Sequence, residues 1–128
     1  MMESEFFKIS EFDCPGLPGS GINMSKDLVS ILDNMRRSLK RPIRISSGYR
    51  TKEHNESLIQ RGYKASKNSE HLRGNAVDIF VNSSSEKWEI VNVAIENSIT
   101  RIGISSNFIH LDIGDRDGSK PGNVIWTY

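Results

Sequence analysis

Two short segments of the sequence each pair a histidine with an aspartate. In SEHLRGNAVD, His71 precedes Asp78 by seven positions, with a glycine between them. In IHLDI, His110 precedes Asp112 by two positions. Imidazole nitrogens and carboxylate oxygens are ligands that zinc takes in proteins. The two segments can therefore supply one metal site if the fold brings them together.

Asp78 is an acidic residue within an apolar segment. Its segment, NAVDIFV at 75–81, predicts a strand, and Gly74 is expected to let the chain turn from a loop into it. Burying an unpaired carboxylate is costly, so a cation or strong donors should lie beside Asp78. That partner can be a metal ion or an arginine, and this segment alone favours neither.

The second segment also predicts a strand, FIHLDIG at 108–114. Residues two apart on a strand point to the same face, so His110 and Asp112 share one face while the apolar residues between them point into the core. A lone histidine on a strand is more often structural. A strand that carries His-x-Asp opposite its buried face is typical of the floor of a site.

Together, His71, Asp78 and His110 would form a set of two histidines and one carboxylate. Catalytic zinc takes three such protein ligands and leaves a fourth position to water. Zinc lowers the pKa of that water from about 15.7 to about 7 and polarises a carbonyl. A base and a cation must then lie nearby. Asp112 is the candidate base, and Arg50, at the end of SSGYR, is the candidate cation.

Other polar residues have a structural alternative. Arg50 can be an ordinary surface arginine at a strand end, and Ser69 can donate a hydrogen bond to substrate or be a plain loop serine. His54, on the first turn of an expected helix, fits a structural hydrogen bond better than a ligand role. Cys14 is the single cysteine and lies in a turn-rich stretch without a nucleophile motif.

The elements that must position these residues are helices and short strands in mixed order. Ser25, Thr51 and Ser83 are expected N-caps, the last with Glu86 in a capping box. The first predicted helix, at about 26–40, should bury an apolar stripe from Leu28 to Leu39. The third, at about 86–97, should bury Trp88, Val91 and Ile95. Residues 6–14 are expected to be an extended lead-in and 63–74 irregular. Helices are predicted at about 26–40, 52–62 and 86–97, and strands at the start of 43–50 and at 75–81, 101–105, 108–114 and 124–128.

The predicted helices and strands do not alternate in a regular βαβ order. This order predicts the α+β class, with a small, largely antiparallel sheet and helices packed on one side. The 128 residues, 36% hydrophobic and 26% charged, fit a single globular domain over 1–128.

The net charge of +1 argues against a nucleic-acid surface. The N-terminus lacks signal-peptide features, and no apolar run could span a membrane. We expect a monomer made in the cytoplasm, which acts elsewhere only if it is exported or released.

The motifs resemble those of a known family. S-x-H-x-x-G-x-A-x-D, here Ser69 to Asp78, resembles the first zinc motif of the D-alanyl-D-alanine carboxypeptidase-like zinc peptidases. These include VanY-type carboxypeptidases, L-alanyl-D-glutamate endopeptidases of phage endolysins and the Hedgehog zinc domain. SGYRTKEHN, RIGI with FIHLDIG, FDCPGLPGSGINM and VIWTY resemble further blocks of the compact subgroup, in the family's order. The resemblance covers nearly the whole chain.

The resemblance implies a Zn²⁺ peptidase acting on peptidoglycan stem peptides, either a carboxypeptidase or an endopeptidase. It implies His71, Asp78 and His110 as zinc ligands, Arg50 as the contact to the substrate carbonyl or carboxylate, and Ser69 as a substrate contact. It also implies an α+β fold with an antiparallel sheet under the site.

One position departs from the family's pattern. Many relatives carry an acidic residue three positions before the last zinc histidine, where this chain has Asn107, which cannot act as a base. Asp112 is then the base or a residue that orients a ligand histidine, with Glu70 as a further alternative. Asn107 also leaves open a non-catalytic zinc domain that binds cell wall or a protein partner. The missing signal peptide fits a phage product or a cytoplasmic enzyme that recycles wall peptides.

Overall fold

Five strands form one sheet at the centre of the described structure. The structure is a computed structural model, and it describes residues 3–63 and 65–128. The strand order is β1-β2-β4-β3-β5. Neighbouring strands are antiparallel, except that β3 and β5 are parallel. The bounds are Ile45–Ser47 for β1, Ala76–Phe80 for β2, Arg101–Ile104 for β3, Phe108–Asp112 for β4 and Val124–Thr127 for β5.

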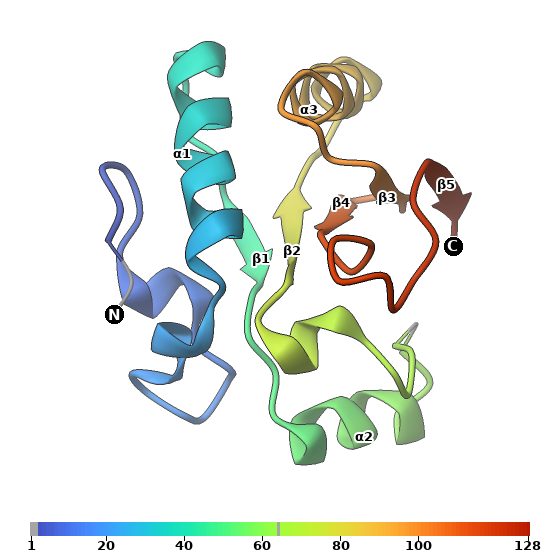
Figure 1. The fold of residues 1–128 in the computed structure, drawn as a ribbon. Coiled ribbons are helices and arrows are strands. Elements are labelled where there is room, and N and C mark those ends of the chain that lie inside the picture. Colours follow the sequence, from blue (N-terminus) through green and yellow to red (C-terminus); the bar gives the residue numbers. More distant parts are fainter. Residues whose placement is uncertain (1–2, 64) are drawn as a thin grey trace.

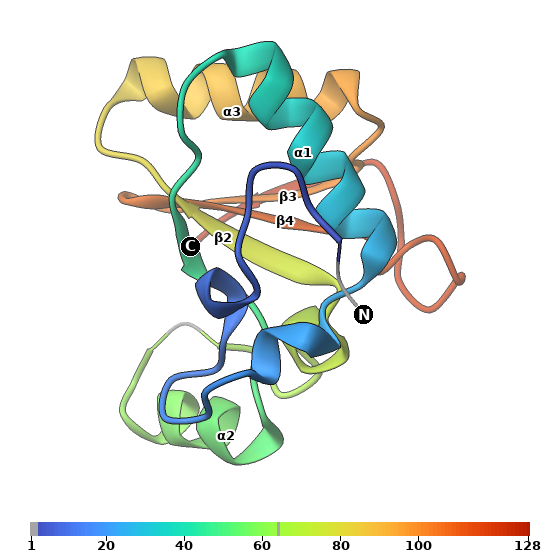
Figure 2. The same cartoon turned by 90° about the vertical axis from the view of Figure 1, so that its left-hand side faces the viewer.

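Two of the three α-helices pack on one face of this sheet, as predicted. Figure 2 shows α1 and α3 over one face, with α2 on the side away from them. None of the described helices has the length and apolar character needed to cross a membrane. The α+β class and the largely antiparallel sheet are confirmed. The elements in Figure 1 are α1 (Lys26–Leu39), α2 (Lys52–Gln60) and α3 (Ser84–Glu96), with 3-10 helices η1 (Ile9–Phe12), η2 (Ser20–Asn23) and η3 (Glu70–Arg73).

The three α-helices begin where their capping residues predict. The hydroxyls of Ser25, Thr51 and Ser83 each accept a hydrogen bond from the backbone N–H three residues further on. Each cap thereby satisfies one of the N–H groups that a helix start leaves without a partner. The second helix ends at Gln60, two residues earlier than predicted.

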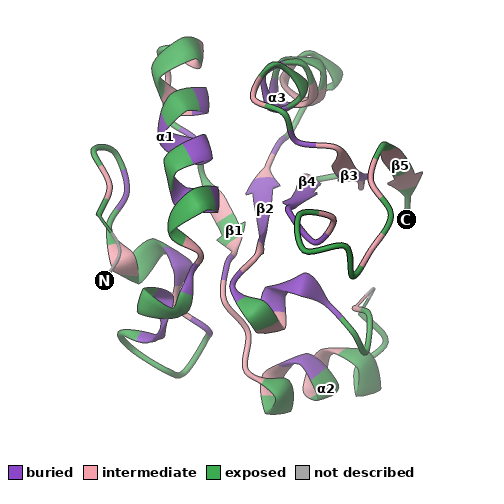
Figure 3. Cartoon of the chain, viewed as in Figure 1, coloured by how far each residue is buried: buried purple, intermediate pink, exposed green. Residues whose placement is uncertain are grey.

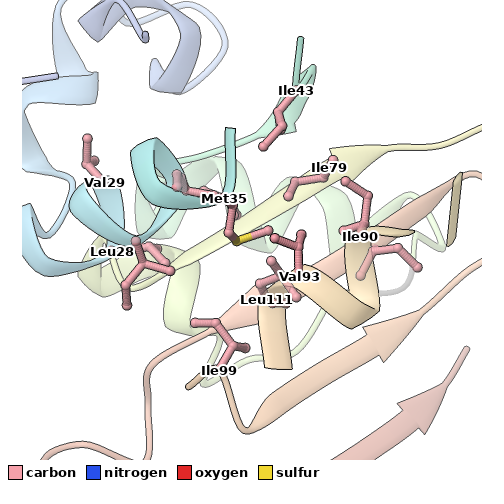
Figure 4. Packing of buried hydrophobic residues seen from close by; sticks show 14 of the residues in the cluster. Leu28, Val29, Met35, Ile43, Ile79, Ile90, Val93, Ile99 and Leu111 are labelled. Carbon is pink, nitrogen blue, oxygen red and sulfur yellow. The ribbon is translucent and has the colours of Figure 1, made fainter. Parts of the chain in front are cut away.

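One apolar cluster fills the space between α1, α3 and the sheet. Figure 3 shows β2, β4 and the inward turns of α1 as buried. Leu28, Leu32 and Met35 of α1 are fully buried, which confirms the predicted stripe. Figure 4 shows how the cluster joins side chains of α1, α3 and the central strands, among them Met35, Ile79, Ile90, Val93 and Leu111.

The buried face of α3 differs from the prediction. Trp88 is 72% exposed and Ile95 is 55% exposed, whereas Ile90, Val93 and Ala94 are buried. The helix has apolar residues around most of its circumference, so their spacing does not define one inward face. Its contacts with α1 and β4 decide which side is covered.

The N-terminal segment also differs from the prediction. Residues 9–12 form η1 rather than an extended lead-in. The carbonyl of Phe12 accepts a hydrogen bond from the backbone N–H of Tyr49, and the ring of Phe12 is fully buried. The segment therefore packs under the chain that leads out of β1.

The burial pattern predicts which apolar residues stabilise the fold. Leu32→Ala should lower the free energy of unfolding by about 2–5 kcal/mol, because it leaves a cavity in a closely packed core. Ile95→Ala should change it by no more than about 0.5 kcal/mol, because that side chain is exposed. Urea unfolding of both variants measures the difference. A loss in Ile95→Ala as large as that expected for Leu32→Ala would contradict the orientation of α3.

Candidate metal centre

Asp78 and His110 meet across two neighbouring strands. They are register partners in the antiparallel pair of β2 and β4. Ile79 and Leu111, next to them along the chain, belong to the apolar cluster, so Asp78 and His110 point to the opposite face of the sheet. Oδ1 of Asp78 lies 3.0 Å from Nδ1 of His110.

His71 reaches the same point from η3. Its Nε2 lies 3.2 Å from Oδ1 of Asp78. One ligand atom from each of His71, Asp78 and His110 lies within 4.8 Å of the others, and all three residues are buried. The structure therefore brings together the three residues that the two motifs predict.

The local structure around η3 turns the chain from His71 towards β2. Ser69 caps η3, and its hydroxyl accepts a hydrogen bond from the backbone N–H of His71. Gly74 ends η3 with a φ of +71°, a left-handed conformation that favours glycine. A Cβ at this position would lie 2.1 Å from the carbonyl oxygen of Asn23. Gly74 is therefore required both for the turn and for the close approach of η2.

Each histidine has its second ring nitrogen held by an acceptor. Nδ1 of His71 lies 2.7 Å from the carbonyl oxygen of Gly48, which can only accept, so Nδ1 carries the proton. Nε2 of His110 lies 2.6 Å from Oδ2 of Asp112 and donates to it. In the neutral rings, the nitrogens that face Asp78 then present lone pairs. Metal-binding histidines are commonly oriented in this way.

This arrangement of donors fits a divalent cation. Two imidazole lone pairs and a carboxylate oxygen point at one place, where they repel unless positive charge lies among them. Two nitrogens and one oxygen are also a common ligand set of catalytic zinc. Without a metal, a proton on a histidine can supply part of this charge.

The pKa shifts reflect this crowding. Burial lowers the pKa of His71, which favours the neutral form that a metal needs. Burial also acts against charge on His110, but hydrogen bonds with Asp112 and Asp78 raise its pKa above the usual value. Burial alone would raise the pKa of Asp78, yet the two histidines hold it well below its usual range. Asp78 therefore stays ionised.

Arg50 lies beside the cluster, as predicted. Its guanidinium donates to Oδ2 of Asp78 at 3.2 Å, to Ser47 Oγ at 3.1 Å and to Asn55 Oδ1 at 3.3 Å. Of the two interpretations of Asp78, the arginine partner is present at Oδ2, while Oδ1 faces the two histidines and is free of Arg50 in this arrangement. Burial lowers the pKa of Arg50.

Asp112 is closely surrounded by donors. Oδ2 contacts His110, while Oδ1 accepts from Nε of Arg101 at 2.6 Å and from the backbone N–H of Gly114 at 3.0 Å. The side chain is 2% exposed. Of the two roles predicted for Asp112, base or orienting residue, this geometry favours the orienting role.

The cluster lies in a cleft of about 660 Å³, a size typical of small-molecule and peptide sites. Ser69 and Arg50 line it, as predicted. Arg101, Trp126 and Tyr128 also line it, although the motifs do not indicate a role for them. Alternation along VIWTY places Trp126 and Tyr128 on the same face, which is the signal that could have found them.

The remaining candidates lie outside the cluster of His71, Asp78 and His110. His54 is on the first turn of α2, outside the cluster. Cys14 is buried, with Sγ 3.8 Å from Oγ1 of Thr51. Glu70 is buried and lines the cleft, where its carboxylate is held by Arg73 and Lys120. In the segment 63–74, expected to be irregular, residue 64 lies outside the described residues and Glu70–Arg73 form η3.

Comparison with a solved structure supports the fold. The crystal structure of Serratia marcescens L-Ala D-Glu endopeptidase ChiX superimposes with a TM-score of 0.59 at 19% sequence identity. The match covers 77% of this chain and 86% of the other. No curated protein gives a significant match.

Comparison with family models gives a match over most of the chain. The model described as Peptidase M15 matches residues 7–112, most of the 128-residue sequence and all three candidate ligands. This agrees with the resemblance seen in the motifs. The chain belongs to the peptidase M15 family.

Proposed function

We propose that the protein is a zinc-dependent peptidase that hydrolyses peptide bonds in peptidoglycan stem peptides. The observation that carries the proposal is the convergence of His71, Asp78 and His110 in a cleft beside Arg50. Membership of a peptidase family supports the reaction class. The named activity of the Serratia structure, an L-Ala D-Glu endopeptidase, supports the substrate class.

Each residue has a role that follows from its contacts. When bound, zinc supplies Lewis-acid chemistry, because it polarises a carbonyl and makes water more acidic. Gly48 and Asp112 keep the two histidines turned towards the ion. Arg50 has five N–H donors, of which three hold Ser47, Asn55 and Asp78. The remaining two can donate to the substrate carbonyl as negative charge develops on its oxygen.

The charges in the cleft favour an endopeptidase over a carboxypeptidase. A carboxypeptidase must bind a terminal carboxylate, which a free cation does best. Among the described cleft residues, the cations already have carboxylate partners at 2.6–3.2 Å. An internal peptide bond carries no such charge. The pairs are Arg50 with Asp78, Arg101 with Asp112 and Lys120 with Glu70.

Defined muropeptides test the activity and the bond. We expect cleavage within the stem peptide, inhibited by a chelator and restored by zinc, with fragments identified by mass spectrometry. Release of a single terminal D-alanine would instead indicate a carboxypeptidase. Sedimentation with intact cell wall, without any product, would support the non-catalytic binding domain and contradict the proposal.

Removal of a ligand tests the metal site. His71→Ala should weaken zinc binding more than about 100-fold, beyond the 10–100-fold typical of groups that only orient a ligand. His54→Ala is the matched control, because that histidine lies outside the cluster, and it should bind zinc as the parent does. Competition with a chromophoric chelator gives both affinities. Equal affinities of the two variants would place the metal elsewhere.

Replacement of the cleft arginine tests its contact with substrate. Arg50→Lys keeps the charge but loses the fork of donors, so kcat/KM should fall by about 100-fold or more. Zinc content, measured on the same preparation, should remain that of the parent. An unchanged kcat/KM would mean that Arg50 does not touch the reacting carbonyl.

A further inference from the structure

Arg101 is a largely buried cation that the roles above do not use. It occupies the first position of β3, and its side chain is 11% exposed. Nε donates to Oδ1 of Asp112 at 2.6 Å, and a terminal nitrogen donates to the carbonyl oxygen of Pro121 at 2.7 Å. The guanidinium also lies 5.2 Å from the centre of the Trp126 ring. One side chain thus joins β4, β5 and the loop between them.

The sheet places these groups in one row beside the metal cluster. Arg101 is the register partner of Asp112 across β3 and β4, and Gly103 is the partner of His110. Residues 101 and 103 share a face, so Arg101 lies next to the strand position that faces His110. On the other side, Gly103 is the partner of Trp126 in the parallel pair of β3 and β5.

Trp126 fills the space above Gly103 and reaches His110. A Cβ at position 103 would lie 2.6 Å from Nε1 of Trp126, so the absence of a side chain there makes room for the indole. The indole and the imidazole of His110 have ring centres 5.4 Å apart. His110 therefore contacts the tilted ring of Trp126 and is held by Asp112 at Nε2, and Arg101 contacts both of these residues.

We propose that Arg101 is a positioning residue that fixes Asp112, so that Asp112 holds the imidazole of His110 with Nδ1 towards the metal. This inference rests on the proposed metal site but not on the identity of the substrate. Without Arg101, the Asp112 carboxylate keeps only the Gly114 N–H at Oδ1 and can rotate. His110 then loses its fixed orientation, and the buried carboxylate loses its balancing charge.

A substitution of Asp112 can test whether Arg101 acts through it. In Asp112→Asn, an amide N–H that faces Nε2 of His110 would move the ring proton to Nδ1, where it blocks the metal. If Arg101 acts through Asp112, removing Arg101 should change the zinc affinity little in a protein that already lacks the Asp112 carboxylate. If Arg101 only supports the fold, the losses of zinc affinity in the two single variants should add in the double variant.

Zinc affinity, measured by chelator competition without substrate, is the readout. Arg101→Gln should bind zinc about 10-fold more weakly or worse, and Asp112→Asn at least as weakly. The double variant should match Asp112→Asn within about twofold, the coupling expected of residues in one network. Arg116→Gln, an exposed arginine in the same loop, is the matched control and should bind as the parent does.

Two further measurements separate positioning from folding. Arg101→Lys can reach Asp112 or Pro121 but not both, and its affinity should lie between those of the parent and Arg101→Gln. It also replaces Arg101→Gln if that variant does not fold. With cobalt in place of zinc, the visible spectrum of the Arg101 variants should change, because the ligand geometry changes, while that of Arg116→Gln should not.

Parental zinc affinity in Arg101→Gln, or additive losses in the double variant, would overturn this inference and leave the proposed function intact. A parent protein that binds zinc with high affinity but cleaves no stem peptide would overturn the function and leave the inference standing. A parent that binds no zinc would overturn both.

Discussion

The buried carboxylate of Asp78 is the constraint on which the rest of the structure depends. It lies in the centre of the sheet with 6% of its surface exposed, so each oxygen needs a partner from the protein or from a bound ion. Oδ1 faces His71 and His110, and Oδ2 faces Arg50. These partners come from η3, from β4 and from the chain after β1. Three separate segments of the chain therefore meet at this one side chain.

One face of the sheet packs into the apolar core, and the other face carries the residues of the candidate site. Along β2 and β4, alternate residues enter the apolar cluster beneath α1 and α3, while the residues between them form the site. A slip of one residue in the pairing would exchange the two sets, placing charge in the core and isoleucine in the cleft. The register that stabilises the fold is thus the same register that assembles the ligands.

Much of this could be predicted from the sequence, because the signals are local. The helix starts depend on single hydroxyls, and the ligand set follows from two short motifs on alternating strands. Alternation along VIWTY places Trp126 and Tyr128 on one face, but it does not show that Trp126 and Arg101 lie beside the ligands. Their positions depend on the parallel pairing of β3 with β5, and nothing within RIGI or VIWTY specifies that partner. The inward face of α3 was also undetermined, since apolar residues surround that helix and only tertiary contacts choose among them.

The parallel pairing of β5 has a consequence for how the cleft forms. Parallel strands require a crossover, and here β4, which carries His110 and Asp112, lies within the connection from β3 to β5. β5 pairs on one side only, at the edge of the sheet, through four residues. Local opening of the native state is easiest at such an edge. Trp126 of this edge strand contacts His110 and Arg101, whereas Asp78 and His110 lie on β2 and β4, which are paired on both sides. One wall of the cleft thus belongs to a strand held on one side only, and the candidate ligands of the sheet belong to its most fully paired strands.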